Sequence, residues 1–465
     1  MSRPPFVVVP ESWINRRWVW VVLLLAAVVP HLNGLDGGFH YDDEHALVRN
    51  THLRHLSEIP RFFVDSSTFS SEPDMAMYRP LLQTTFALNH GLAGYNPWSW
   101  HVVNVLIHGL AVFGAFALLR KVLHPHVALG AALLYALHPA HSQPINYLSS
   151  RSETLCIALV LWALALLQSK RAGWSVLLYA GALLTKSAAV VFLPVAALLY
   201  CVRPGHRRHW QHLLPHSVTT AVYLILISAE GFLPRSLAQD VRPMATQLWT
   251  QCKGIVYYLS LAVVPHGLSI EHDFVVSAEF WNPPVLLSAS LALSLLWLNR
   301  GAWKTRLPVF GLGALWFLSA LGLPFLVPLN VIINEHRLYL PLLGFAIVVG
   351  TALPSLQRAH RALLVLMCVI FCGLSISQNR LWQNELQLWG TATKRAPNSF
   401  RSWSNLALAQ HTSGDRKSAL VSYERALKLN PGHARAWNNL GLLREESGQL
   451  VAARDAYVRA AEQSP

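Results

Sequence analysis

The sequence has few charged residues. Asp, Glu, Lys and Arg make up 13% of its 465 residues, whereas hydrophobic residues make up 53%. A typical soluble domain has about 25% charged residues, so this composition excludes a chain that lies mainly in water. The apolar residues gather in blocks of about 17 to 25, the length that crosses about 30 Å of hydrocarbon as a helix. We therefore predict an all-α, polytopic membrane protein.

Cysteine is also scarce, and its placement excludes a disulfide framework. The longest polar loop has none, because every cysteine lies in or beside an apolar segment. A small-residue cleavage site is missing after the first apolar run, so we expect a retained helix and not a signal peptide. The five cysteines are Cys156, Cys201, Cys252, Cys368 and Cys372.

Eleven apolar runs are predicted to be membrane spans. A further run at 248–265 is interrupted by Lys253 and Gly254, so we expect a re-entrant or interfacial helix there. The spans are predicted at 17–33, 100–120, 125–140, 153–169, 173–185, 187–202, 213–230, 282–299, 307–328, 338–353 and 362–377.

The charges of the short loops predict the orientation of the chain. Basic pairs such as Arg16–Arg17, Arg120–Lys121 and Lys170–Arg171 fall on one side of the spans, which is typical of the cytoplasmic side. Nearly all acidic residues of the membrane part fall on the other. We expect an inner (cytoplasmic) membrane protein with a cytoplasmic N-terminus and extracytoplasmic chemistry. The formal charge of +14 is then explained by flanks that rest on anionic headgroups, so no nucleic-acid partner is expected.

After the last span, aromatic and small residues recur with a period of 34 residues. Such a period is typical of tetratricopeptide repeats, in which small residues let paired helices approach and aromatic residues fill the gap between them. Trp403, Leu406, Ala419, Tyr423 and Ala426 recur as Trp437, Leu440, Ala453, Tyr457 and Ala460.

The period also sets the predicted domains. The membrane domain is predicted at 1–378 and the repeat domain at 379–465, with a half repeat at 381–399 and repeats at 400–433 and 434–465. Eleven crossings place this short solenoid in the periplasm. We expect it to bind a partner protein or acceptor through its aromatic residues, namely Trp403, Tyr423, Trp437 and Tyr457.

The extracytoplasmic loop at 33–99 contains the run Asp42-Asp43-Glu44. Adjacent carboxylates repel one another, which raises the pKa of at least one unless cations or hydrogen bonds compensate. Such a carboxylate can take the proton of an attacking hydroxyl as a general base. A solvated acidic loop has the same composition, so the residues alone leave both interpretations open.

A second polar cluster follows the third span and contains His138, His141, Arg151 and Glu153. Two histidines three residues apart are candidate metal ligands, but Pro139 breaks the helix that would align them. We therefore expect helix-end hydrogen bonding or substrate contact there. No cofactor is certain, and a divalent metal is the weaker alternative.

Further charged groups are predicted at the outer membrane boundary. Each taken singly is as well explained by an anchor that snorkels to the interface. Together they supply cations for a phosphate beside apolar helices for a lipid tail, which is what a lipid-linked phosphate requires. These groups are expected to surround one cavity, and the segment 268–274, with Glu271 and Asp273, is expected to face it as well. The boundary residues are Arg79, Lys186, Glu335, Arg337 and Tyr339.

These motifs resemble the transmembrane and tetratricopeptide-repeat O-mannosyltransferase family and its bacterial relatives, which are multi-spanning glycosyltransferases of the GT-C type. The resemblance covers nearly the whole chain. It rests on Tyr41-Asp42-Asp43, Tyr78-Arg79-Pro80-Leu81, His138-Pro139-Ala140-His141 with Arg151 and Glu153, and Arg337-Leu338-Tyr339-Leu340-Pro341.

The resemblance implies an inverting transfer of a hexose, mannose in the family, from a polyprenyl-phosphate donor to a hydroxyl of an extracytoplasmic protein. Asp42 or Asp43 is then the base, and some of the basic residues hold the leaving phosphate. The implied substrate-binding residues are Glu44, Arg79, His138, His141, Arg151, Glu153, Lys186, Glu335, Arg337 and Tyr339.

Two other functions fit parts of the sequence. One is a non-catalytic membrane scaffold that recruits partners through its repeats. The other is a transporter of lipid-linked sugars, which needs polar groups along a path through the membrane. The charges here concentrate at one face instead, which disfavours the transporter.

Overall fold

The computed structural model describes residues 16–202, 206–234, 241–300, 308–328, 330–352 and 358–463. Within these ranges every regular element is a helix, and they contain no strand. The chain divides into two compact units. One comprises residues up to His266 together with Val276–Asn379, and the other comprises Gly267–Val275 with Arg380–Pro465. The ends of the predicted spans at 307 and 353 lie outside the described residues.

Each of the eleven predicted spans contains an apolar helix. Five of the described helices are long and apolar enough to cross a membrane by length and composition, whereas six are shorter. The five are Arg17–Gly34, Pro97–Val122, Leu148–Leu167, Trp210–Ala229 and Ala359–Leu381. The six are Pro125–Leu137, Ala172–Leu183, Ser187–Cys201, Pro283–Leu298, Val309–Ala320 and Pro341–Thr351. They support a multi-pass membrane protein, while the number of crossings stays a prediction.

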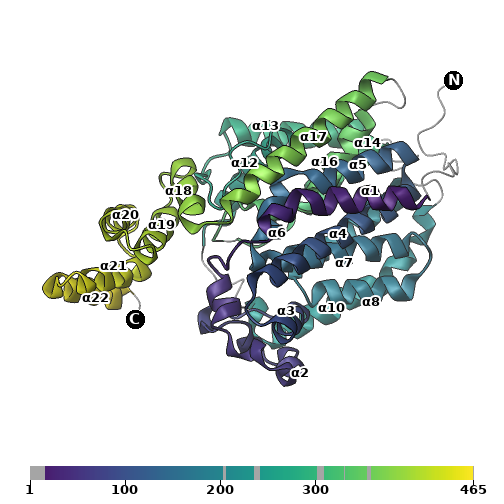
Figure 1. Ribbon diagram of the computed structural model, residues 1–465. Helices are drawn as coiled ribbons and strands as arrows, with labels where there is room; N and C mark the ends of the chain where they lie inside the picture. The colour runs from purple at the N-terminus through teal and green to yellow at the C-terminus, as the bar shows by residue number, and fades with distance from the viewer. Residues whose placement is uncertain are drawn as a thin grey trace. The chain divides into compact units, whose positions relative to one another are not determined.

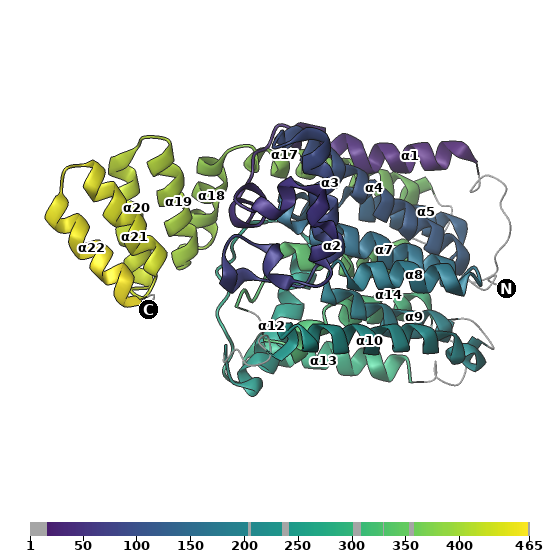
Figure 2. The same ribbon diagram turned by 90° about the horizontal axis from the view of Figure 1, so that it is seen from below.

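The first unit is a bundle in which several long helices lie side by side (Figures 1 and 2). At one end of the bundle lies the segment 33–99, called the outer loop after its predicted side, with α2 (Ile59–Phe62) and α3 (Pro80–Ala93). The helices of the bundle are α1 (Arg17–Val28), α4 (Pro97–Val122), α5 (Pro125–Leu137), α7 (Arg151–Leu167), α8 (Ala172–Leu183), α9 (Phe192–Val202), α10 (Leu214–Ala229), α12 (Met244–Val263), α13 (Pro283–Leu298), α14 (Val309–Ala320), α16 (Pro341–Ala352) and α17 (Arg358–Leu381).

Two glycines allow α14 and α16 to touch through their backbones. A Cβ added to Gly313 would lie 2.6 Å from the carbonyl oxygen of Gly344, and one added to Gly344 would lie 2.5 Å from that of Gly313. Small residues at such crossings are typical of membrane helices, whose association depends on close packing. Any side chain at either position would push the two helices apart.

Helix α12 runs without a break through Lys253 and Gly254, as an interfacial helix can. Its re-entrant or interfacial placement stays a prediction. Gly254 is buried, and a Cβ there would come within 3.5 Å of the Ile333 side chain. That distance is an ordinary van der Waals contact, and Gly254 does not interrupt the helix.

The outer loop is folded around an apolar core of its own. Leu47, Leu53, Phe62 and Phe69 are buried together with Phe86 of α3 and others. This burial fixes the loop against the first residues of α3 and α4. Asp43 of the acidic run is buried in this packed structure, whereas Asp42 and Glu44 are about half-exposed.

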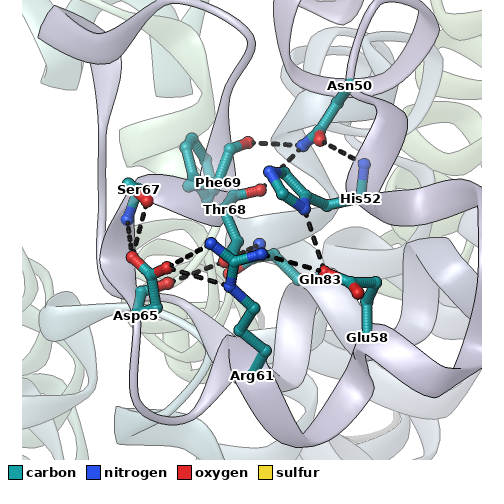
Figure 3. A network of polar contacts seen from close by, with 9 residues as sticks. All are labelled: Asn50, His52, Glu58, Arg61, Asp65, Ser67, Thr68, Phe69 and Gln83. Atoms are coloured by element: carbon teal, nitrogen blue, oxygen red, sulfur yellow. Dashed lines mark hydrogen bonds and ion pairs between the residues drawn. The ribbon is translucent and has the colours of Figure 1, made fainter.

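A network of polar contacts joins different parts of this loop to one another (Figure 3). Arg61 donates to Asp65 at 3.0 Å, and the ring of His52 lies 3.0 Å from Glu58 Oε2. The Asn50 side chain donates to the carbonyls of Thr68 and Phe69, each at 3.0 Å. The bonds from Asn50 satisfy buried backbone carbonyls where the chain has little regular structure.

The second unit consists mainly of paired helices in the predicted repeats. They are α18 (Glu385–Arg395), α19 (Phe400–Thr412), α20 (Arg416–Leu429), α21 (Ala434–Glu446) and α22 (Leu450–Gln463). The starts of α19 and α21, and those of α20 and α22, are each 34 residues apart. Side-chain contacts repeat too, since Trp403 and Trp437 donate to the carbonyls of Pro397 and Pro431 at 2.9 and 2.8 Å.

The segment Gly267–Val275 belongs to this second unit, contrary to the expectation that it faces the membrane-side cavity. Glu271 accepts from Arg401 Nε at 2.8 Å and from Arg401 Nη2 at 3.1 Å. Asp273 accepts from Asn398 at 2.9 Å. A bidentate carboxylate–guanidinium pair is among the stronger polar contacts, and it explains why the acids of this segment turn to the repeats.

Candidate active site

A cavity of about 290 Å³ in the first unit brings together residues far apart in the chain. It contains one of the two aspartates of the acidic pair, Asp42, together with the cations Arg79, Lys186 and Arg337. Its wall also includes His45, Phe69, Met75, Met77, Phe86, Tyr147, Ser149, Asn334 and His336.

Backbone contacts explain how the cations meet. Arg79 immediately precedes α3, and the N–H of Leu81 donates to the carbonyl of Leu184 at 3.1 Å. This bond joins the start of α3 to the turn after α8 in which Lys186 lies. The N–H of His336 donates to Gln143 Oε1 at 2.9 Å, which ties the segment of Arg337 to α6 (Ser142–Asn146).

Arg337 is held by its own segment. Its Nη1 and Nη2 donate to the carbonyls of Ile332 and Val331 at 2.7 and 2.8 Å. These bonds fix the guanidinium at the cavity wall without neutralising it, because the partners are uncharged.

Lys186 forms an ion pair with Glu153 at 2.6 Å, and both side chains are largely buried. Burial lowers the pKa of Lys186, Glu153 raises it, and the nearby Arg79 lowers it again. The ion pair joins two of the predicted site residues, so each charge has a partner of opposite sign. Glu153 thus positions Lys186 beside the cavity.

The pKa of His336 indicates that the cavity is electrostatically positive. Burial first, and then the positive charges of Lys186, Arg337 and Arg79, hold the pKa of its ring well below the usual value. Three cations that repel a proton here will attract an anion. The cavity therefore suits a phosphate more than a neutral ligand.

The two aspartates of the acidic pair have different surroundings. The Asp42 side chain is 45% exposed, and its Oδ1 lies 3.5 Å from His45 Nε2. The Asp43 side chain has no exposed surface. Its Oδ1 accepts from the N–H and hydroxyl of Ser149 at 2.7 and 2.5 Å, and its Oδ2 accepts from the N–H of His40 at 2.9 Å. Burial raises the pKa of Asp43 to about 6, although these hydrogen bonds oppose the shift.

Arg151, one of the four candidate phosphate ligands, does not line the cavity. It is fully buried, and Nε donates to Asn104 at 2.6 Å while Nη2 donates to Asn89 at 2.9 Å. Its guanidinium also lies over the rings of Phe86 and Trp100. Its donors are used inside the protein, so its role is to pack the base of the outer loop.

The histidines and tyrosine of the predicted site also face inward. His138 uses both ring nitrogens, accepting from the N–H of Ala140 at 3.2 Å and bonding the carbonyl of Ala262 at 3.0 Å. The Tyr339 hydroxyl bonds His108 Nδ1 at 2.7 Å. The ring of His141 packs edge-on against that of Tyr339 at 4.5 Å. These three predicted residues are buried and do not line the cavity.

Two predicted acids lie elsewhere as well. Glu44 accepts from Arg49 at 2.8 Å on the exposed side of the loop, and Glu335 is 1% exposed and does not line the cavity. Among the described residues there is also no group of three or more His, Cys, Asp and Glu placed to hold a metal ion.

The aromatic residues predicted to bind a partner serve the repeats themselves. Tyr423 is fully buried between helices, which removes it from any binding surface. Tyr457 donates to Glu445 at 2.6 Å and packs against Gly441. Trp403 and Trp437 remain partly exposed while bonding backbone carbonyls.

Tyr147 and Ser149 were not predicted as site residues. The Tyr147 hydroxyl accepts from the N–H of Asp42 at 3.2 Å, across 105 positions of the chain. Ser149 reaches Asp43 across 106 positions. Both lie in a short neutral stretch, so no local pattern distinguishes them.

Comparison with known proteins agrees with the resemblance predicted from the sequence. Residues 76–231 match the family model described as dolichyl-phosphate-mannose-protein mannosyltransferase, and residues 405–465 match a tetratricopeptide-repeat model. The chain is similar to protein O-mannosyltransferases. That predicted resemblance is confirmed. The first match includes Arg79, Glu153 and Lys186 but begins after the acidic pair.

Two relatives illustrate the similarity. The protein O-mannosyl-transferase F38B6.6 of Caenorhabditis elegans is 24% identical over 441 residues, which cover 88% of this chain and 62% of the relative. The human protein O-mannosyl-transferase TMTC4 is 25% identical over 508 residues, covering 90% of this chain and 67% of the relative. The chain thus spans about two thirds or less of the length of these relatives.

Solved structures give a weaker likeness. ArnT from Cupriavidus metallidurans, bound to undecaprenyl phosphate, aligns with a TM-score of 0.44 and 14% identity, covering 98% of this chain and 78% of that chain. An oligosaccharyltransferase from Archaeoglobus fulgidus aligns with a TM-score of 0.42 and 13% identity, covering 88% of this chain and 59% of that chain.

Proposed function

We propose that this chain is a membrane glycosyltransferase that transfers a hexose, mannose by similarity, from a polyprenyl-phosphate donor to a hydroxyl of an extracytoplasmic protein. One observation is central. A half-exposed carboxylate, Asp42, shares a single cavity with three cations, Arg79, Lys186 and Arg337. The similarity to protein O-mannosyltransferases supports the reaction class.

Asp42 is the general base of this proposal. Its carboxylate takes the proton of the acceptor hydroxyl while the hydroxyl oxygen attacks the anomeric carbon of the sugar. The bond from that carbon to the phosphate oxygen breaks, and its electron pair leaves with polyprenyl phosphate. Attack opposite to the leaving group inverts the configuration at the anomeric carbon.

The three cations stabilise the leaving phosphate. Negative charge on the phosphate grows as the bond breaks, and preorganised positive groups in a site shielded from water favour that change. Glu153 keeps Lys186 in place before the donor binds. The apolar helices beside the cavity provide a surface for the polyprenyl chain, and the reaction needs no cofactor chemistry.

The proposed setting is the inner membrane with the cavity on its outer side. The basic flanks of the helices then face the cytoplasm, as the charge bias of such loops favours. The repeat unit lies on the same side as the cavity in this arrangement. Its proposed partner is the acceptor protein or a protein that delivers it.

A test in cells uses mass spectrometry of the proteins outside the inner membrane. Cells that express the wild-type chain are compared with cells that lack the gene and with cells that express Asp42→Asn. We expect hexose on Ser or Thr of some proteins only with the wild-type chain. Asp36→Asn serves as the control, because Asp36 is an exposed acid of the same loop.

A non-catalytic scaffold gives a different result in this experiment. If the glycans are the same with and without the gene, the chain is not a protein glycosyltransferase. If Asp42→Asn keeps the modification while deletion of residues 380–465 removes it, the repeats and not the cavity are responsible.

A further inference from the structure

The acidic pair is held from outside its own loop by one short stretch, Tyr147-Leu148-Ser149, between α6 and α7. The Tyr147 hydroxyl accepts from the N–H of Asp42 at 3.2 Å. The Ser149 N–H and hydroxyl both donate to Asp43 Oδ1, at 2.7 and 2.5 Å. Each aspartate is thus bound by a different member of the same stretch, and both members line the cavity.

We propose that Tyr147 and Ser149 are positioning residues of the transferase, and that Asp43 is the anchor through which they hold Asp42 toward the cavity. This inference rests on the proposed function, since it concerns the placement of the proposed base. It assigns the two aspartates separate roles. Asp42 accepts the proton, whereas Asp43 fixes the loop.

The contacts of Asp43 argue against a role as the base. Both of its oxygens already accept hydrogen bonds, three in total from Ser149 and His40. Its side chain has no exposed surface through which an acceptor hydroxyl can approach. A general base must lie within hydrogen-bond reach of the proton that it removes.

The backbone next to the pair supports an imposed geometry. Tyr41 has a φ of 52°, in the left-handed region that a residue with a Cβ rarely adopts. Such conformations persist where the surroundings determine them, and they cluster at functional sites. The hydrogen bonds from Tyr147 and Ser149 hold Asp42 and Asp43, which directly follow Tyr41, and so impose the conformation of Tyr41.

The anchor depends on charge, because the donors of Ser149 and His40 bond an ionised carboxylate more strongly than a neutral one. The titratable and charged groups that face Asp43 are His40 and Asp42 from its own loop, Tyr147 from the stretch after α6, and Arg151 at the start of α7. Since burial raises the pKa of Asp43 to about 6, the anchor is ionised above that pH and protonated below it.

The sign of the pH effect follows. Transfer is expected to fall as the pH drops through about 6, because protonation of Asp43 weakens the hydrogen bonds from Ser149 and His40 that position the pair. The Ser149 hydroxyl lowers the pKa of Asp43. Removing this hydroxyl therefore moves the acid limb of the pH profile to higher pH.

The loop contains a matched control. The Ser67 N–H and hydroxyl both donate to Asp65 Oδ1, at 3.0 and 2.6 Å, with the same pattern as Ser149 and Asp43 (Figure 3). This second pair is exposed and does not line the cavity. Ser67→Ala removes the same kind of bond without touching the proposed anchor.

The experiment measures kcat and KM from pH 5 to 8 for the purified full-length chain, with polyprenyl-phosphate mannose and an acceptor protein identified in cells. Ser149→Ala is expected to lower kcat about tenfold to a hundredfold with little change in the KM of the donor. Its acid limb should move up by about one pH unit, as loss of one charged hydrogen bond implies. Tyr147→Phe, which leaves the Asp42 N–H unpaired, should lower kcat at all pH values.

Two further variants separate positioning from general damage. Ser149→Thr keeps the hydroxyl and should restore the acid limb, because Ser149 borders open space at the cavity. Ser67→Ala should match the wild type throughout. Hydrogen exchange of residues 40–46 gives a readout that needs no activity, and it should be faster in Ser149→Ala alone.

The outcomes distinguish the inference from the proposed function. A wild-type chain without transfer activity contradicts the proposed function. Even then, the anchoring role of Asp43 is supported if hydrogen exchange at residues 40–46 is slower in the wild type than in Ser149→Ala. An active Ser149→Ala with a wild-type pH profile and wild-type exchange overturns the positioning role. A Ser149→Thr variant that is as impaired as Ser149→Ala overturns it too.

Discussion

Glycosyl transfer from a lipid phosphate needs a negative group as the base and positive groups to bind the phosphate. The cavity contains both, namely Asp42 and the cations Arg79, Lys186 and Arg337. The carboxylate is half-exposed, so it can meet an acceptor. The three cations all lower the pKa of His336, and Lys186 also pairs with Glu153. Arg79 precedes α3 and lies over the ring of Phe69 at 5.6 Å.

Arg79→Ala should weaken binding of the donor. A hydrogen bond to a charged group contributes about 1.5–3 kcal/mol, so the KM of the donor should rise about tenfold to a hundredfold. Titration of polyprenyl-phosphate mannose at fixed acceptor measures this change. Arg49→Ala is the matched control, because Arg49 is in the same loop but pairs with Glu44 on its exposed side. An equal KM in both variants would remove Arg79 from the phosphate site.

The site residues that could be predicted from the sequence are those with an unusual local pattern. The run Asp42-Asp43-Glu44 and the basic residues at the outer boundary are charged groups in an apolar chain, and Asp42, Arg79, Lys186 and Arg337 do line one cavity. Arg151 had the same signal, yet it is buried among amides and aromatic rings. Composition cannot tell a charge that faces a cavity from one that packs a core.

The helices of the membrane part were predictable because each apolar block is long and bounded by charges. The outer loop was not, since its core residues Leu47, Leu53, Phe62 and Phe69 are spaced without a helical or strand period. Lys253 and Gly254 interrupt the apolar run of α12 but not the helix, because a single glycine is tolerated inside a helical pattern.

Gly344→Ala should destabilise the contact between α14 and α16. The added Cβ would lie 2.5 Å from the carbonyl oxygen of Gly313, and backbone cannot move aside as a flexible side chain can. Overpacking of this kind costs about 1–3 kcal/mol, so the unfolding midpoint in detergent should fall by several degrees. Gly373→Ala in α17 is the control, because a Cβ there meets no atom within 4 Å. A Gly344→Ala midpoint at or above that of the control would refute the close contact.

At the scale of the whole chain, the repeats form a unit of their own from Arg380 onward, together with Gly267–Val275. The period of 34 made this unit predictable, because the same contacts must recur in every repeat. The attachment of Glu271 to Arg401 was not predictable, since the two are 130 positions apart. The bundle alone contains every residue that lines the proposed active site.

Deletion of residues 380–465 should therefore separate two properties. The shortened chain keeps the cavity, so transfer to a short Ser- or Thr-containing peptide at high concentration is expected to persist. Transfer to a folded acceptor protein should fall strongly, because recruitment through the repeats is lost. Comparing the two acceptors at equal hydroxyl concentration measures this, and equal losses for both would contradict a recruiting role.

The transfer rate of the purified full-length chain carrying Asp42→Asn tests the central claim most directly. The assay contains polyprenyl-phosphate mannose and an acceptor protein, with the wild type and Asp36→Asn measured beside it. General-base catalysis contributes about 10²- to 10⁴-fold, so Asp42→Asn should lose that factor in kcat while Asp36→Asn matches the wild type. If Asp42→Asn transfers mannose at the wild-type rate, Asp42 is not the base and the proposed mechanism is contradicted.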